Sequence, residues 1–176
     1  MVTVFVEREL EPGTQLEAVQ AAEDAVAWCL SQHRVRFLRT YLSLDGSKMV
    51  CVYEAPDAES VRETQRRAGL PVAHAFSVLP VGELRGVSAR AGMSTVIVQR
   101  AFEAPIPPDV VLEAMRSGAS CFSTHRATLL ASNLSTDLTR MVCVFEAPDA
   151  ESVRMANRQI GVPFTRVWTA NVSVAP

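Results

Sequence analysis

Polar side chains that could transfer a proton stand in segments that otherwise read as apolar strands. Glu7 shares the alternate positions of Phe5 in "TVFVER", so both side chains should project from one face of a sheet. A carboxylate partly removed from water has a raised pKa and can serve as a general base, with tyrosine or histidine as its proton partner. We therefore predict a catalytic group that consists of Glu7, Tyr41 and His74.

Candidate ligand-binding side chains occupy comparable strand positions and differ between the two halves of the chain. When the sequence is shifted by 92 residues, Glu7 corresponds to Gln99 and Tyr41 to Asn133. Tyrosine and tryptophan combine an apolar body with a polar tip, which suits an aromatic or polycyclic ligand. The predicted substrate-binding residues are Phe5, Arg39, Tyr53, Gln99, Asn133, Arg166 and Trp168.

A plainer interpretation of Glu7 stays open beside the catalytic one. Its carboxylate could form a structural ion pair with Arg39 or Arg8 at a strand end, because such pairs are commoner than active sites. No GxSxG, HExxH, Walker or dinucleotide-binding pattern occurs that would assign a reaction class. The catalytic hypothesis therefore depends on which side chains the strands bring to one face.

One peptide occurs twice with almost no change. "MVCVYEAPDAESVR" at Met49–Arg62 returns as "MVCVFEAPDAESVR" at Met141–Arg154, with thirteen of fourteen positions identical. The same offset of 92 residues serves from the first predicted strand to the last, which indicates a tandem repeat of one supersecondary unit. We expect one repeat over residues 1–79, a linker over 80–93 and a second repeat over 94–176.

Apolar periodicity within each half indicates the element order βαββαβ, the ferredoxin-like unit. Residues 2–9 alternate as a strand, and two strands surround Asp45–Gly46. A closing strand is expected at "VAHAFSVL". The first helix is predicted from apolar residues that recur at a spacing of three or four, namely Leu16, Val19, Val26 and Leu30.

Two kinds of turn are expected to join these elements. Asp45–Gly46 predicts a tight hairpin, but the second half has Asp137–Leu138 there and lacks the glycine, so its turn should differ. In the repeated peptide, Pro56 should end the strand and Asp57 should cap the helix that follows. The repeated peptide is therefore interpreted as a structural turn and not as a catalytic signature.

Composition excludes several classes of function. The 176 residues are 48% hydrophobic and 20% charged, with 17 basic and 19 acidic side chains, which is ordinary for a globular protein and gives no nucleic-acid footprint. No apolar run approaches the roughly 18 residues that a membrane span needs, and the first residues do not resemble a signal peptide. We expect a cytoplasmic protein whose partner is a small-molecule ligand, not nucleic acid or a membrane.

The pattern "FVEREL…CVYEAPDAESVRETQRRAGLP" resembles a small bacterial family of nickel-binding-protein-like domains of unknown function. Members of that family are similar to one half of this chain and are ferredoxin-like α+β folds that pair sheet against sheet in a dimeric barrel. The resemblance therefore implies an α+β fold of two tandem ferredoxin-like βαββαβ repeats that pack as a pseudo-dimeric α+β barrel. It also implies a monomeric pseudo-dimer or a weak homo-oligomer.

The metal-binding positions that the resemblance implies are not matched here. Where family members often carry histidines, this chain has Arg39 and Thr64 in the first half and Ala131 and Ala156 in the second. A nickel site needs imidazole or comparable donors, so we predict no metal site and no cofactor, with nickel as the cofactor that the family suggests.

Three hypotheses of function follow from these observations. The first is a small-molecule-binding α+β barrel, with an inter-sheet cavity in which a cofactor-independent enzyme would carry out proton transfer or cyclisation. The second is a nickel-binding or metal-responsive protein, and the third is a non-catalytic interaction scaffold. Divergence of the polar strand residues favours the first, because a duplicated homodimer can specialise a cavity only by losing its symmetry.

Overall fold

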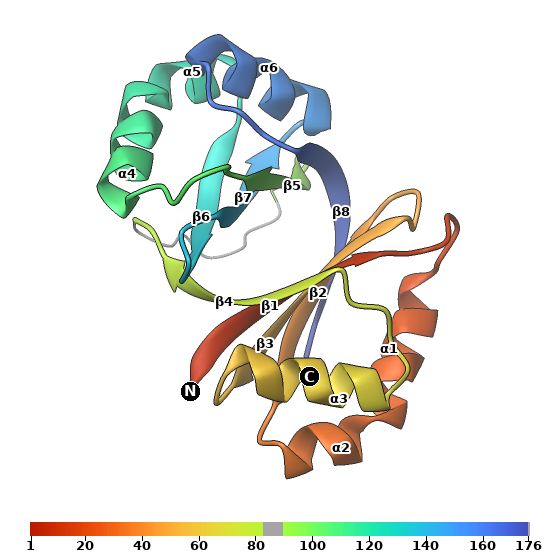
Figure 1. Cartoon of the computed structure of the whole chain (residues 1–176). Coiled ribbons are helices and arrows are strands. Elements are labelled where there is room, and N and C mark those ends of the chain that lie inside the picture. Colours follow the sequence, from red (N-terminus) through yellow and green to blue (C-terminus); the bar gives the residue numbers. More distant parts are fainter. Residues whose placement is uncertain (83–89, 176) are drawn as a thin grey trace. The chain divides into compact units, whose positions relative to one another are not determined.

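The computed structural model describes residues 1–82 and 90–175 (Figure 1). The chain divides into two compact units, Leu79–Ala170 and Met1–Val78, the latter joined by the last residues of the chain from Asn171 onward. Residues 83–89 of the predicted linker lie outside the described part, so the predicted domain boundaries stay a prediction. No helix in the described ranges is long and apolar enough to cross a membrane.

The first repeat has the predicted strand and helix order, with one helix divided in two. The helix expected from Leu16 to Leu30 is interrupted at Val26, whose φ of −109° and ψ of 7° are not helical. The elements are β1 (Val2–Glu9), α1 (Leu16–Ala25), α2 (Ala27–Gln32), β2 (Arg36–Ser43), β3 (Lys48–Ala55), α3 (Ala58–Arg67) and β4 (His74–Pro80).

The second repeat has the same order, including the divided helix. Its first helix ends before Gly118, and a short second helix follows at once. The elements are β5 (Ser94–Ala101), α4 (Pro108–Ser117), α5 (Ala119–Thr124), β6 (Thr128–Ser135), β7 (Arg140–Ala147), α6 (Ala150–Ile160) and β8 (Arg166–Val174).

Each repeat forms an antiparallel sheet with helices packed on one face. β1 pairs with β3 and β4, and β3 pairs with β2; in the same way β5 pairs with β7 and β8, and β7 pairs with β6. Alternation along β1 sends Val4 and Val6 into the core under α1–α3, whereas Phe5 projects from the opposite face. Figure 1 shows the three helices of each repeat gathered on one side of its strands.

The repeated peptide forms a strand stop followed by a helix start, as predicted. β3 ends at Ala55, and the carboxylate of Asp57 accepts a hydrogen bond from the Ser60 backbone N–H at 2.7 Å. Asp149 makes the same bond to Ser152 at 2.8 Å. These bonds satisfy a backbone donor that the helix itself leaves free, so the peptide serves the fold in both repeats.

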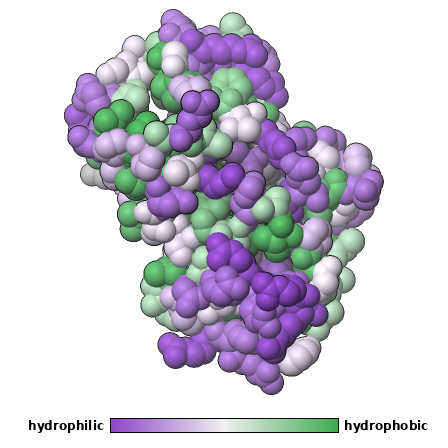
Figure 2. All heavy atoms as spheres, viewed as in Figure 1, coloured by the Kyte–Doolittle hydropathy of each residue, from purple (hydrophilic) through white to green (hydrophobic). Residues whose placement is uncertain are grey.

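The outer face of α3 is hydrophilic. Figure 2 shows hydrophilic residues gathered over this helix, in the lower part of the view. Arg62 pairs with Glu59 at 2.9 Å and Arg67 pairs with Glu63 at 2.8 Å, all on one exposed surface. Such exposed pairs contribute little to stability, and they indicate a solvated helix face.

The two hairpin turns are alike, so the prediction that they differ is wrong. Gly46 has a φ of 70° and Leu138 has a φ of 64°. In both turns a serine hydroxyl donates to the aspartate carboxylate, at 2.5 Å from Ser43 and 2.6 Å from Ser135. Leucine tolerates this left-handed conformation because its side chain packs against the core of the second repeat, which repays part of the backbone strain.

Candidate functional site

The register places most of the predicted site residues of the first repeat on one sheet face, opposite the helices. One row of this face crosses β2, β3, β1 and β4 and holds, in that order, Tyr41, Val50, Glu7 and His74. Glu7 therefore pairs directly with His74, whereas β3 separates it from Tyr41. All but His74 are buried. Arg8 lies on the other face, which excludes it as the ion-pair partner of Glu7.

The next row on the same face holds Arg39, Val52, Phe5 and Phe76. The ring centroids of Phe5 and Phe76 are 6.5 Å apart. The Arg39 guanidinium donates a long hydrogen bond of 3.5 Å to the hydroxyl oxygen of Tyr41. The structure therefore brings Phe5, Arg39, Tyr41 and Glu7 together in adjacent rows.

The second repeat presents the corresponding row in the same order, Asn133, Val142, Gln99 and Arg166. Trp168 stands one row further, and its indole N–H donates to the side-chain carbonyl of Gln99 at 2.8 Å. Within each repeat these residues of the two rows are thus neighbours. Their catalytic and ligand-binding roles stay a prediction.

Tyr53 does not join this set, because it projects from the other face of the sheet. It lies opposite Val4 and Phe37, in the core under the helices, and is fully buried. Its hydroxyl donates a short hydrogen bond to the carboxylate of Glu23. Its position next to the helices corrects the prediction that it shares a surface with Tyr41.

Tyr53 belongs instead to a buried polar cluster that joins β1, β3, α1 and α3. The guanidinium of Arg8 donates to Gln65 at 2.5 Å and lies 3.8 Å from the carboxylate of Glu23. Arg8 also donates to the carbonyl of Pro71. Burial raises the pKa of Glu23, and the hydrogen bond from Tyr53 and the charge of Arg8 oppose that rise.

The sequence carried a signal for this cluster that the helical pattern obscured. Glu23 stands in the apolar stripe of α1, between Val19 and Val26, where a charged residue is out of place. Its counterpart in the second repeat is Met115. A carboxylate on the core-facing stripe in one repeat and a thioether in the other should have marked the space under the helices as the place where the repeats differ.

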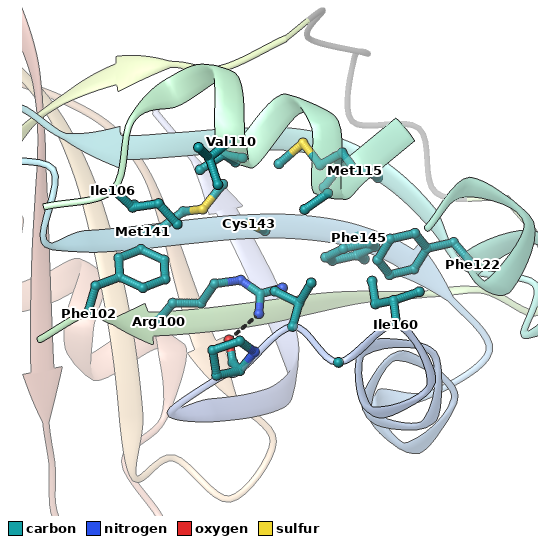
Figure 3. Close-up of a pocket in the computed structure, with 16 residues that line it drawn as sticks. Arg100, Phe102, Ile106, Val110, Met115, Phe122, Met141, Cys143, Phe145 and Ile160 are labelled. Atoms are coloured by element: carbon teal, nitrogen blue, oxygen red, sulfur yellow. Dashed lines mark hydrogen bonds between the residues drawn. The ribbon is translucent and has the colours of Figure 1, made fainter. Parts of the chain in front are cut away.

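The second repeat has a pocket of about 200 Å³ between its sheet and its helices (Figure 3). The second repeat has apolar residues at the two positions whose polar side chains contact Arg8 in the first repeat. Met115 is the counterpart of Glu23, and Phe145 is the counterpart of Tyr53. Apart from Arg100 the lining is apolar, and it includes Phe102, Ile106, Val110, Phe122, Met141 and Ile160. In the first repeat a separate space of about 10 Å³ lies beside Val19, Glu23 and Phe37, the counterparts of three residues that line the larger pocket.

Arg100 is the charged residue of this pocket and the counterpart of Arg8. It is 6% exposed, and its guanidinium donates to the carbonyl of Pro163 and to the side-chain carbonyl of Asn157, both at 2.5 Å. Both acceptors are neutral. Among the described residues no carboxylate forms an ion pair with Arg100, whereas Arg8 has Glu23.

The histidines of the described residues are not gathered at one metal site. Within residues 1–82 and 90–175, no group of three His, Cys, Asp or Glu side chains could hold a metal ion. His33 and His125 lie at the ends of α2 and α5, and His125 is bonded to Gln159 at 3.1 Å. The pocket has no histidine to serve as an axial haem ligand.

Comparison with solved structures identifies the fold. The chain is similar to chlorite dismutase from Candidatus Nitrospira defluvii (13% identity, 96% of this chain and 89% of that one, TM-score 0.51). It is also similar to a heme-binding protein from Thermus thermophilus (9% identity, 97% and 90%, TM-score 0.50). These similarities confirm the predicted α+β fold class of tandem ferredoxin-like repeats.

A single repeat is comparable with a smaller protein. SCO4226 from Streptomyces coelicolor A3(2) matches with 18% identity and a TM-score of 0.42, over 46% of this chain and 99% of that one. Comparison with curated proteins gave no match. The model of the nickel responsive protein SCO4226-like family matches twice, over residues 5–78 and 96–169, which confirms the predicted resemblance. The chain therefore belongs to the SCO4226-like family of nickel responsive proteins.

Proposed function

We propose that the chain binds a small molecule in the helix–sheet pocket of its second repeat. The observation that carries this proposal is the pocket itself, about 200 Å³ of space between the sheet and the helices of the second repeat. Protein interiors are close-packed, and ligand sites are concave, mostly apolar and furnished with few polar groups. The pocket has this character, because its lining is apolar except for one buried arginine, Arg100.

Binding of a neutral aromatic probe tests the proposal. Calorimetric titration with benzyl alcohol should detect binding to the wild-type chain, because a cavity of about 150 Å³ already admits benzene. Ala114 lines the pocket, and Ala114→Phe should weaken that binding about tenfold or more by filling the space. The same substitution at its counterpart, Ala22→Phe, should leave the affinity unchanged. Equal weakening by both variants, or no binding to the wild type, would contradict the proposal.

A nickel-responsive function is the second candidate, supported by membership of the family. The described residues of one chain supply no three-ligand group, so we expect less than one tightly bound Ni²⁺ per chain. Equilibrium dialysis of untagged protein against Ni²⁺, with elemental analysis, measures this directly. Stoichiometric nickel that survives gel filtration would instead establish the metal-binding function.

Catalysis by Glu7, Tyr41 and His74 stays a prediction. The register supports it, because Glu7 pairs with His74 on the neighbouring strand and a carboxylate and an imidazole on one sheet face can act on the same substrate as base and acid. The interaction scaffold is the remaining alternative. It would be favoured over ligand binding if no small molecule entered the pocket.

A further inference from the structure

We infer that the ligand of this pocket is a small apolar carboxylic acid, bound as its anion. Its carboxylate pairs with Arg100, as Glu23 pairs with Arg8 in the first repeat, and its apolar body fills the pocket. This inference rests on the proposed function and specifies the ligand class of the same site.

The first repeat shows how this fold accommodates a buried arginine between its sheet and its helices. Arg8 is 2% exposed, Glu23 is 5% exposed, and their charged groups are 3.8 Å apart. The Tyr53 hydroxyl donates to the same carboxylate oxygen of Glu23 and itself lies 3.4 Å from the Arg8 guanidinium. A buried guanidinium is thus matched by a buried anion, which is how proteins keep such charges.

The second repeat keeps the arginine and loses the anion. Arg100 donates to Asn157 and Pro163, as Arg8 donates to the equivalent Gln65 and Pro71, and all of these acceptors are neutral. Met115 and Phe145 stand where the carboxylate and the phenol would be, and both line the pocket. The pocket therefore lies beside a buried arginine that has only neutral acceptors.

Arg100 is positioned to bind an anion from the pocket. Figure 3 shows its side chain extending among the lining residues, between Phe102 and Ile160. Its two hydrogen bonds use two of the five N–H donors of a guanidinium, which leaves donors for a carboxylate. In an apolar lining a charge-assisted hydrogen bond is about twice as strong as a neutral one, so an anionic group gains most there.

The dimensions of the pocket limit the apolar body of the acid. A cavity of about 150 Å³ holds benzene, so about 200 Å³ fits one ring or a short chain with a carboxylate attached. The aromatic walls, Phe102, Phe122 and Phe145, favour a ring through offset or edge contacts. Phenylacetate is a suitable probe of this class, and phenylacetamide is its neutral counterpart.

The test compares these two probes on the wild type and on two matched variants. Calorimetry at pH 7 should show phenylacetate bound about tenfold or more tightly than phenylacetamide, because only the acid supplies the missing charge. Met115→Glu restores the carboxylate of the first repeat and should abolish phenylacetate binding. Met155→Glu makes the same change at an exposed position of α6 and should leave the affinity unchanged.

Each outcome decides between the two proposals. Equal affinity for acid and amide would overturn the inference and leave the proposed function intact, whereas binding of neither probe, nor of benzyl alcohol, would overturn both. Undiminished phenylacetate binding by Met115→Glu would also overturn the inference. If the thermal unfolding of Met115→Glu shows a misfolded chain, Arg100→Gln replaces it, and the affinity for phenylacetate must then fall to that for phenylacetamide.

Discussion

Replacing Arg8 by methionine is expected to lower the free energy of unfolding by about 3–5 kcal/mol at pH 7. The substitution leaves the carboxylate of Glu23 buried, 5% exposed, without the cation that lies 3.8 Å away. It also removes the donor to Gln65. Urea denaturation followed by circular dichroism measures the change in the free energy of unfolding.

The loss should depend on pH in one direction. Burial raises the pKa of folded Glu23 above its ordinary 4.5, so the unfolded chain releases this proton first as the pH rises. The stability linked to the protonated carboxyl is present below pH 4.5 and is lost as the pH rises through the folded pKa. Removing the charge of Arg8 raises the folded pKa further. The deficit of Arg8→Met should therefore be larger at pH 7 than at pH 4.

The equivalent change in the second repeat is the control. Arg100→Met leaves only neutral acceptors without their donor, on Asn157 and Pro163, which costs about 1–3 kcal/mol. That cost should be the same at pH 4 and pH 7. Equal losses for the two variants, or a deficit of Arg8→Met that does not change with pH, would show that Glu23 is not held by Arg8.

Gly46→Leu is expected to destabilise the first repeat by about 2–4 kcal/mol, although leucine occupies the equivalent turn of the second. A Cβ atom at Gly46 would lie 2.4 Å from the backbone oxygen and 2.5 Å from the backbone nitrogen of Thr14, so the loop after β1 would have to move. The positive φ of 70° adds strain for any L-residue. Thermal unfolding and urea denaturation both measure the loss.

The reverse substitution separates the two causes. Leu138→Gly relieves the strain of a φ of 64° and loses the packing of a partly buried side chain, so a change of only about 1 kcal/mol is expected. If Gly46→Leu is tolerated as well as Leu138→Gly, the close approach of Thr14 is not a constraint on this turn.

Much of the fold could be predicted because local rules act in each segment. Alternation marked β1, and Pro56 with Asp57 marked the end of a strand and the start of a helix. Because the second half repeats the first, the same elements could be predicted there at an offset of 92 residues. The turn at Leu138 was mispredicted because packing of its side chain against the core overrides the local preference for glycine.

The candidate site was only partly predictable. Glu7 lies in a strand with a regular alternation, so its face and its neighbours followed from the pattern. β3 is apolar on both faces, and nothing in its sequence tells which face carries Tyr53; the pairing with Val4 decides it. The pocket is lined by side chains from several elements, and its volume depends on how those elements pack, which the exchange of Glu23 for Met115 does not reveal in the sequence.

The central claim is that the second repeat alone binds a small acid beside Arg100. The six methionine methyl groups report on it by nuclear magnetic resonance, since Met115 and Met141 line the pocket. Met49 is the counterpart of Met141 in the first repeat, and Met155 is exposed. Titration with phenylacetate should shift the Met115 and Met141 signals in a saturable manner and leave those of Met49 and Met155 in place. Shifts of Met49 instead, or unshifted Met115 and Met141 signals at saturating phenylacetate, would contradict the claim.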